Sequence, residues 1–333
     1  MKKKVLAAIL TGIMLLSLVG CGAKEEAPAA EAPVAEAPAA TEEAVEEEAP
    51  AAEAIKVGVL MKTMSDTFSN KLGESIKAYA AETYADVELY LMDGQADVAK
   101  QISQAEDLIA KQVDVIVLNP QDADGSAQVL DLAAEAGIPV IEVNTETVRT
   151  DYVSYVGSND VMAGEIMGNF VMEQLGEAGG QYAVLEGEIG QSAQILRAEG
   201  IANTIQANDA YECVAQLTAN WQRDQAMSTT EDWLGKYPDL KAVICHNDDM
   251  SMGALQAAEA QGRDIIIIGT DAIPDALAAV KEGRLEGTVL QDAATQASTA
   301  VDVAVKVAKG EEVEPKYDVP FQLITIDNVD DFI

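Results

Sequence analysis

The chain has 333 residues, of which 49% are apolar, and a formal net charge of −36 at pH 7. This length is enough for more than one domain with its own hydrophobic core. So large a negative charge would repel phosphate backbones, and we therefore expect no nucleic-acid partner. Of the three cysteines, Cys213 and Cys245 lie in apolar strand-like runs, which favours buried thiols over a disulfide.

The first twenty residues have the pattern of a secretory signal. Three lysines precede an apolar run that is too short for a membrane-spanning helix. The run ends in Leu18-Val19-Gly20-Cys21, which resembles the lipobox of bacterial lipoproteins. The resemblance implies that residues 1–20 are a lipoprotein signal peptide and that Cys21 is lipidated, which would hold the exported chain at the outer face of the cytoplasmic membrane. An ordinary signal peptide with an incidental cysteine is the alternative.

Residues 21–54 are predicted to be a disordered tether that begins at the lipidated cysteine. From Lys24 to Ala54 the sequence is almost entirely Ala, Glu and Pro, without an aromatic residue. Such a segment buries too little apolar surface to offset the entropy of ordering its backbone. Proline and the repulsion between glutamates should keep it extended.

Apolar runs typical of strands alternate with stretches of helical periodicity in the rest of the chain. The runs are rich in Val and Ile on both faces, as in parallel sheets covered by helices. Before residue 160 the predicted strands are Ile55–Met61, Val87–Met92, Val113–Leu118, Val140–Val143 and Tyr152–Val156, with helices at Phe68–Thr83, Val98–Lys111 and Ser126–Ala136. Beyond it, helix Val161–Leu175 precedes strands at Tyr182–Leu185, Tyr211–Leu217, Ala242–Cys245, Ile265–Ile268 and Gly287–Leu290. Two successive α/β units predict two lobes with a ligand cleft between their strand ends.

Polar residues follow closely after five of the predicted strands. They are Asn119, Asn144, Asn247, Asp271 and Gln291. Each of them, taken singly, could be a helix cap or a turn residue. Together they could converge on one cleft, where amide and carboxyl groups suit ligand hydroxyls that both donate and accept hydrogen bonds.

Two aromatic residues complete this pattern in a chain with only 5% aromatic residues. Phe68 is predicted in the loop after the first strand, and Trp221 follows the strand-like run that ends at Leu217. Flat aromatic side chains can cover the apolar face of a sugar ring while polar groups bind its rim. The alternative is that both side chains belong to the core.

Three segments carry a resemblance to a known family, namely residues 247–254 (NDDMSMGA), 269–276 (GTDAIPDA) and 287–292 (GTVLQD). They resemble the periplasmic sugar-binding proteins, which include ribose-, galactose- and glucose-binding proteins. The similarity extends from Ile55 to the end of the chain. It is closest to the glucose/galactose-binding protein, through Tyr155-Val156-Gly157, Ala272-Ile273-Pro274 and the placement of Trp221.

The resemblance implies an α/β protein with the type I periplasmic binding protein fold, in which two doubly wound parallel-sheet lobes are joined by a three-strand hinge. The N-terminal lobe would comprise residues 55–158 and 292–318, and the C-terminal lobe residues 159–291 and 319–333. The hinge crossings would lie near Gly157–Asp160, Gln291–Ala293 and Asp318–Phe321. Ligand would shift the lobes from an open to a closed arrangement.

The resemblance also implies the residues of the ligand site. Phe68 and Trp221 would sandwich a pyranose ring, and Arg197 would be a fork-shaped donor to a ring oxygen or two hydroxyls. The residues that would hydrogen-bond the ring are Asp66, Asn119, Arg197, Asn247 and Asp271.

The sequence departs from the glucose/galactose pattern at several of these places. Gln191 and Ala193 stand where that pattern has histidine and aspartate, Gln291 stands for its final asparagine, and Lys62 adds a cation. With Asn144, the residues Lys62, Gln191 and Gln291 complete the predicted ligand-binding set. We expect a hexopyranose such as galactose or glucose, with a pentose, a uronic acid or a nucleoside as alternatives. Residues 176–180 lack the oxygen ligands of a calcium loop, and neither a metal nor a cofactor is expected.

A protein of this kind would be the substrate-binding component of an ABC importer. It would act as a monomer that delivers a monosaccharide to an ABC permease, whose partner ATPase supplies the energy. A sensor subunit that presents its ligand to a chemoreceptor or sensor kinase would have the same cleft, so that alternative stays open. A sugar-responsive repressor is disfavoured by the export signal and by the lack of a basic DNA-binding helix.

The sequence shows no constellation of catalytic residues, and we expect no enzymatic activity. The single histidine, His246, has no plausible nucleophile partner. Gly187 and Gly190 are not followed by the Lys-Ser/Thr of a phosphate-binding loop. Asp248 and Asp249 begin a predicted helix, where they are interpreted as caps and not as a glycosidase pair.

Overall fold

The computed structural model describes residues 54–333. The predicted signal peptide, the lipidation of Cys21 and most of the tether lie outside the described residues. Within residues 54–333 no helix has the length and apolar character needed to cross a membrane. The same part of the chain contains two free cysteines, of which Cys245 is buried and Cys213 half-buried.

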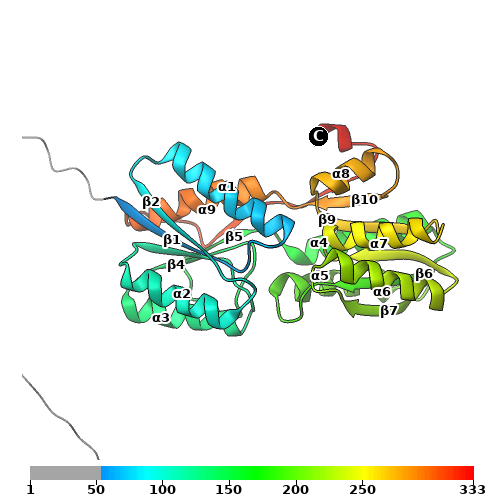
Figure 1. The fold of residues 1–333 in the computed structure, drawn as a ribbon, viewed down its shortest axis with the longest axis horizontal. Coiled ribbons are helices and arrows are strands. Elements are labelled where there is room, and N and C mark those ends of the chain that lie inside the picture. The colour runs from blue at the N-terminus through cyan, green and yellow to red at the C-terminus, as the bar shows by residue number, and fades with distance from the viewer. Residues whose placement is uncertain (1–53) are drawn as a thin grey trace, which may run out of the picture. The chain divides into compact units, whose positions relative to one another are not determined.

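The first sheet is six-stranded and entirely parallel, with the order β11-β5-β4-β3-β1-β2. Its strands are β1 (Ile55–Met61), β2 (Val87–Asp93), β3 (Val115–Leu118), β4 (Val140–Val143), β5 (Ser154–Gly157) and β11 (Lys316–Asp318). The helices α1 (Thr67–Thr83) and α9 (Ala293–Ala308) pack on one face, and α2 (Val98–Ala110) and α3 (Gln128–Ala136) on the other (Figure 1). A short 3-10 helix, Gly125–Ala127, precedes α3.

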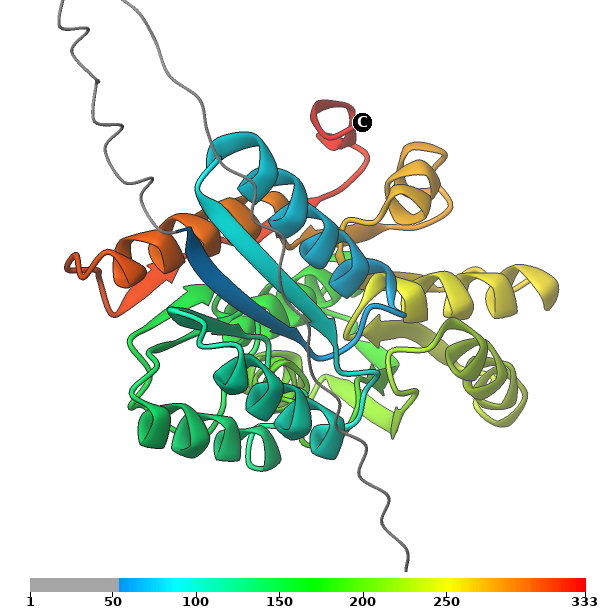
Figure 2. The ribbon, with the colours of Figure 1, turned by 60° about the vertical axis from the view of Figure 1, so that its left-hand side comes forward.

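The second sheet has the order β12-β10-β9-β8-β6-β7, and only β12 runs antiparallel to its neighbour. Its strands are β6 (Gly180–Glu186), β7 (Tyr211–Thr218), β8 (Leu240–Cys245), β9 (Ile266–Asp271), β10 (Gly287–Leu290) and β12 (Gln322–Ile324). The helices α4 (Asp160–Leu175) and α5 (Ser192–Asn203) cover one face, and α6 (Arg223–Lys236), α7 (Asp248–Ala260) and α8 (Pro274–Lys281) cover the other. Figure 2 shows α7, in yellow, beside α6. The 3-10 helices Ile205–Ala207 and Val329–Asp331 complete this part.

The inner strands are buried on both faces, which explains their continuous apolar sequences. All four residues of β3 and of β4 are buried, including Glu142 among the Val and Ile of β4. A strand covered by helices on both faces has no solvent side on which polar residues would alternate. The predicted alternation of strands and helices in two α/β lobes is therefore confirmed, and it has the architecture that the resemblance implied, the type I periplasmic binding protein fold.

The chain passes between the two sheets three times. It leaves the first sheet after β5 and enters α4 of the second, returns between β10 and α9, and crosses again between β11 and β12. Side-chain hydrogen bonds join two of the crossing segments, because Gln296 at the start of α9 donates to Ser158 at 3.0 Å and accepts from Asn144 at 3.3 Å. The chain thus changes sheets at three places, and that these segments act as a hinge stays a prediction.

Several predicted element boundaries differ from the structure by one to three residues. Phe68 lies in the first turn of α1 and not in a loop, because Asp66 caps the helix by accepting a hydrogen bond from the backbone N–H of Ser69 at 2.7 Å. Strand β9 extends to Asp271, three residues beyond its apolar run. The polar end of β9 stays in the ladder because Leu290 of β10 pairs with Asp271.

Candidate ligand-binding site

A small cavity lies where the carboxyl ends of both sheets meet. Its own side chains nearly fill it, leaving ≈ 20 Å³ open to a water-sized sphere, and all the side chains that line it except Asp66 are buried. The lining residues are Lys62, Asp66, Phe68, Ser69, Asn144, Ala193, Arg197, Trp221, Asn247, Asp271 and Gln291. The structure thus brings nine of the eleven predicted ligand-binding residues to one cavity, as expected for strand ends that face each other.

Two aromatic side chains line the cavity from opposite sheets. Phe68 is 8% exposed and comes from α1, and Trp221 is 9% exposed and comes from the loop after β7. The backbone of Trp221 is left-handed, with φ of 62°. Gly187 makes room for the indole, because a Cβ at this position would lie 1.9 Å from the Trp221 ring. A bulkier residue at 187 would therefore displace the aromatic wall.

Arg197 is held on three sides by the protein. Its Nε donates to the Asp160 carboxylate at 2.8 Å, one terminal nitrogen donates to the carbonyl of His246, and the other donates to Oε1 of Gln291 at 3.1 Å. Its guanidinium also lies 5.8 Å from the centre of the Trp221 ring. A guanidinium has five N–H donors, so two remain for a ligand. Asp160 was missed as a partner from sequence, because it reads as an ordinary residue at a helix start.

Two groups that face the cavity have free hydrogen-bonding capacity. Nε2 of Gln291 is buried without a partner among the described residues. Burial raises the pKa of the Asp271 carboxyl well above its usual range, although Arg197 acts in the opposite direction. A buried polar group without a partner is costly, and ligand hydroxyls would supply the missing donors and acceptors.

Lys62 connects the two sides of the cavity. Its Nζ donates to Oε1 of Gln191 at 3.1 Å and lies 5.6 Å from the centre of the Trp221 ring. Burial lowers the pKa of Lys62, and the nearby Asp66 carboxylate opposes that shift. Gln191 itself does not line the cavity, and its Oε1 also accepts from Nε1 of Trp221 at 3.1 Å. The structure therefore places Gln191 behind the aromatic wall.

Asn119 is the second predicted ligand residue that does not line the cavity. It is fully buried, and its amide donates to the carbonyl of Val143 at 3.1 Å and to the hydroxyl of Thr145 at 2.8 Å. Its Oδ1 accepts from the backbone N–H of Lys62 at 3.3 Å. The side chain holds the ends of β1, β3 and β4 together, which sequence position alone could not distinguish from ligand contact.

The segment 188–192 makes most of the direct contacts across the cleft. The backbone N–H of Ala123 donates to the carbonyl of Gly190 at 3.0 Å, and Gln121 donates to the Glu188 carboxylate at 3.0 Å. The hydroxyl of Ser192 accepts from the backbone N–H of Glu146 at 2.9 Å. We call residues 188–192 the latch. The latch was not predicted as a contact between the lobes, because its partners are distant in the chain and no motif marks them.

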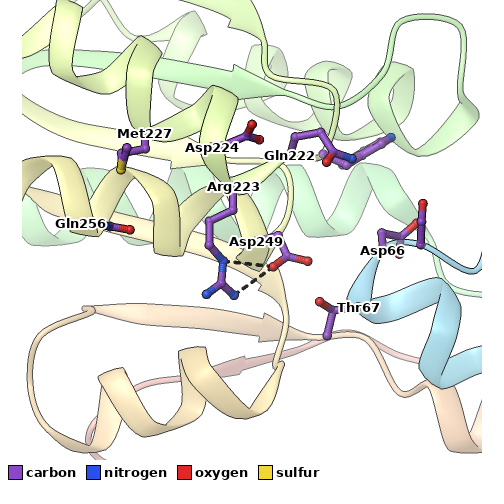
Figure 3. Close-up of a pocket in the computed structure, with 10 residues that line it drawn as sticks. Asp66, Thr67, Gln222, Arg223, Asp224, Met227, Asp249 and Gln256 are labelled. Atoms are coloured by element: carbon purple, nitrogen blue, oxygen red, sulfur yellow. Dashed lines mark hydrogen bonds and ion pairs between the residues drawn. The ribbon is translucent and has the colours of Figure 1, made fainter.

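A groove open to solvent lies next to the cavity, and Asp66 and Trp221 line both (Figure 3). In the groove, Arg223 forms ion pairs with Asp249 at 2.9 Å and with Asp275 at 3.0 Å. Figure 3 shows Asp249 pointing toward Arg223 across the groove. Asp249 is thus occupied in an ion pair, and Asp248 at the same helix start is fully buried.

The single histidine is not placed for acid–base catalysis. His246 is fully buried, and burial lowers its pKa to about 3, with Arg197 acting in the same direction. A neutral imidazole enclosed in this way has no nucleophile to activate. Among residues 54–333 no group of three His, Cys, Asp or Glu side chains is placed to hold a metal ion.

Comparison with known proteins places the chain in a family. The model of the periplasmic binding protein domain matches residues 57–312. The chain belongs to this family. A putative rhizopine-binding protein of Rhizobium meliloti is 38% identical over 85% of this chain and 94% of its own. The ribose import binding protein of Salmonella typhimurium is 30% identical over 80% of this chain and 90% of its own.

Solved structures agree with the fold of this periplasmic binding protein. An ABC transporter solute-binding protein from Bacillus halodurans, solved with bound myo-inositol, is 36% identical with a TM-score of 0.81, covering 85% of this chain and 99% of that one. Membership makes the chain an extracytoplasmic solute-binding protein and not an enzyme, as predicted. The expected special likeness to the glucose/galactose-binding protein was too narrow, because these relatives are named for rhizopine and ribose.

Proposed function

We propose that this protein is the ligand-capturing component of an ABC importer for a six-membered polyhydroxylated ring, either a hexopyranose such as glucose or galactose or a cyclitol such as myo-inositol. The observation that carries the proposal is the cavity between Phe68 and Trp221, in which polar groups with free capacity surround two aromatic faces. Aromatic faces suit the apolar sides of a ring, and amides, carboxylates and a guanidinium suit its hydroxyl rim.

The charges around the cavity favour a ligand without a carboxylate. Asp66 and Asp271 line the cavity, and Arg197 is already paired with Asp160. Lys62 is the one cation among the lining residues that forms no ion pair in the described structure. A uronic acid would bring a third carboxylate into this buried space, at a high desolvation cost. A neutral ring therefore fits better than the acidic alternative.

The bound solute in one relative supports a cyclitol, whereas the name of another relative favours a pentose. The Bacillus halodurans structure contains myo-inositol, and the Rhizobium meliloti and Salmonella proteins are named for rhizopine and ribose. A cyclitol has the same ring size as a pyranose and a complete rim of hydroxyls. We therefore extend the expected hexopyranose to cyclitols, with a pentose as the smaller competitor.

Capture would proceed by hinge closure. The N-terminal lobe supplies Phe68 and Lys62 and the C-terminal lobe supplies Arg197, Trp221 and Asp271, so a ligand contacts all of them only when the lobes are closed. Differential contact with the closed state is what shifts such an equilibrium. The closed protein would dock on the permease, and the ATPase would drive transport. Lipidation of Cys21 would hold the protein at the outer face of the membrane.

A thermal-shift and calorimetric screen tests the proposed ligand class. We expect myo-inositol, D-glucose or D-galactose to raise the melting temperature, because a ligand that binds only the folded state stabilises it by mass action. D-ribose, D-glucuronate and a nucleoside serve as competitors. A rise in melting temperature with ribose or the nucleoside alone would contradict a six-membered ring as the ligand. No rise with any of the compounds would contradict the proposed ligand class.

Truncation of the aromatic wall tests the site. Trp221→Ala should weaken binding of the stabilising ligand about a hundredfold. It removes the aromatic face that stacks on the ring and the indole N–H that donates to Gln191. Trp233→Phe is the matched control, since Trp233 lies in the core of α6. Trp233→Phe also leaves Trp221 as the sole tryptophan, whose fluorescence should change on binding. Equal affinity in both variants would contradict the site.

A further inference from the structure

A second carboxylate lies behind the cavity, at the start of α7. Asp248 is fully buried and follows Asn247, which lines the cavity. It takes part in no ion pair within the described residues, and the ordinary interpretation of an aspartate at this helix position is a favourable interaction with the helix dipole. The Asp248 side chain also forms hydrogen bonds with two other segments of the second sheet, the turn after β9 and strand β10.

The Asp248 carboxylate accepts hydrogen bonds from the turn after β9 and from strand β10. Oδ2 accepts from the backbone N–H of Ile273 at 3.1 Å, and both oxygens accept from the hydroxyl of Thr288 at 2.8 Å. The same Thr288 hydroxyl accepts from the backbone N–H of Ala272 at 3.2 Å. One carboxylate and one hydroxyl thus bind both N–H groups that follow Asp271.

The turn that they hold has an unfavourable backbone. Asp271 has φ of 128° and Ala272 has φ of 57°, both in the region that favours glycine. Residues in such conformations persist only when their surroundings fix them, at a cost of about 1–3 kcal/mol each. The hydrogen bonds from Ala272 and Ile273 provide that fixation. Asp271 lines the cavity, so the conformation of this turn bears directly on its place there.

The neighbouring strand leaves space for this arrangement. A Cβ at Gly269 would lie 2.3 Å from Oδ1 of Asp248 and 2.8 Å from the hydroxyl of Ser251. Glycine at this position of β9 therefore admits the carboxylate. Thr288 in turn lies three residues before Gln291, whose amide faces the cavity.

We infer that Asp248 is a positioning residue of the ligand site, which with Thr288 aligns the segments that carry Asn247, Asp271 and Gln291. It touches no ligand itself. The expected effect of Asp248 on ligand affinity rests on the proposed function. Its expected effect on the turn after β9 rests on the geometry alone. A helix cap would stabilise α7 without controlling the turn after β9.

The experiment compares matched substitutions by calorimetry with the ring that binds the wild type, chosen from myo-inositol, D-glucose and D-galactose. Asp248→Asn and Thr288→Val should each weaken binding about tenfold or more, because the first replaces one of the two acceptor oxygens by an NH2 donor and the second removes the hydroxyl that binds the turn. Thr288→Ser keeps the hydroxyl and should retain affinity within about threefold. Asp249→Asn removes the same charge one residue along the helix and should bind as the wild type does.

Amide hydrogen exchange at Ala272 and Ile273 provides a measurement that needs no ligand. It should accelerate in Asp248→Asn and Thr288→Val but not in Asp249→Asn or Thr288→Ser. Wild-type exchange and affinity in Asp248→Asn and Thr288→Val would overturn the inference, even if their melting temperatures fall. Should Asp248→Asn not fold, the two Thr288 variants decide. A wild type that binds none of the three rings contradicts the proposed function, while exchange at the turn still decides the positioning role.

Discussion

Nε1 of Trp221 and Nζ of Lys62 donate to the same atom, Oε1 of Gln191, each at 3.1 Å. Gln191 therefore joins the aromatic wall of one lobe to a buried lysine of the other. Its Nε2 donates in turn to the Glu188 carboxylate at 3.0 Å, which accepts from Gln121 of the first lobe. The chain of hydrogen bonds links the shape of the cavity to closure of the cleft.

Gln191→Leu should weaken ligand binding about tenfold. The substitution keeps the size of the side chain but leaves the Trp221 indole and the Lys62 ammonium without their acceptor, and an unpaired buried donor is costly. Calorimetry on Gln191→Leu and on Gln222→Leu, an exposed glutamine beside Trp221, measures the difference. Equal loss in both variants would show that the bridge has no special part in binding.

Gly190→Ala should weaken binding about tenfold without touching the ligand. Gly190 has φ of 98°, and a Cβ there would lie 2.4 Å from Oδ2 of Asp122 in the other lobe, so the latch could not approach. Gly310→Ala is the control, because Gly310 also has positive φ but no atom within 4 Å of an added Cβ. Small-angle scattering at equal ligand concentration should report a more open Gly190→Ala protein. A compact Gly190→Ala protein with unchanged affinity would contradict the latch.

Lys62 should make ligand affinity depend on pH in the alkaline range. Closure buries the ammonium, and burial lowers its pKa below the ordinary 10.5. The closed state therefore binds the proton less tightly, so affinity for a neutral ring should rise as pH rises toward 10.5. Calorimetry in buffers of different ionisation enthalpy should detect proton release on binding. Lys62→Met should abolish that release and the exposed Lys71→Met should preserve it, whereas release from Lys62→Met would assign the proton to another group.

Glu142 should make the stability of the unliganded protein depend on pH. Its carboxyl accepts from the hydroxyl and backbone N–H of Thr147, yet burial raises its pKa to about 7 from 4.5. The folded state then binds this proton more tightly than the unfolded state. The contribution of the Glu142 carboxyl to the free energy of unfolding should therefore fall by about 3 kcal/mol as pH rises from 4.5 to above 7.

Chemical denaturation of Glu142→Gln tests that contribution. The variant should lose this decline with pH, and the exposed Glu135→Gln should keep it. An identical decline in Glu142→Gln would mean that other groups cause it.

Much of the fold could be predicted from the sequence because its signals are local. Buried parallel strands give continuous apolar runs, and β1, β4 and β10 begin and end where predicted. The extension of β9 could not be predicted, because Gly269 and Asp271 have low strand propensity and are held in the strand by ladder pairing with β10.

The strand-end residues of the candidate site could be predicted as a set. Which of them line the cavity and which hold neighbouring segments in place could not be predicted. Asn119 and Asn144 follow adjacent strands with the same residue type, yet only Asn144 lines the cavity while Asn119 bonds to neighbouring loops. Asp248 reads as a cap from sequence, whereas its buried contacts reach Ile273 and Thr288. Such differences depend on contacts between residues distant in the chain, which spacing cannot show.

The most direct measurement is a crystal structure of the protein with the ring that stabilises it most. We predict a six-membered ring between Phe68 and Trp221, with its hydroxyls within hydrogen-bonding distance of Arg197, Asp271 and Nε2 of Gln291. A ligand seated in the open groove beside Arg223, or a ring in the cavity that leaves Asp271 and Gln291 without partners, would contradict the proposed capture site.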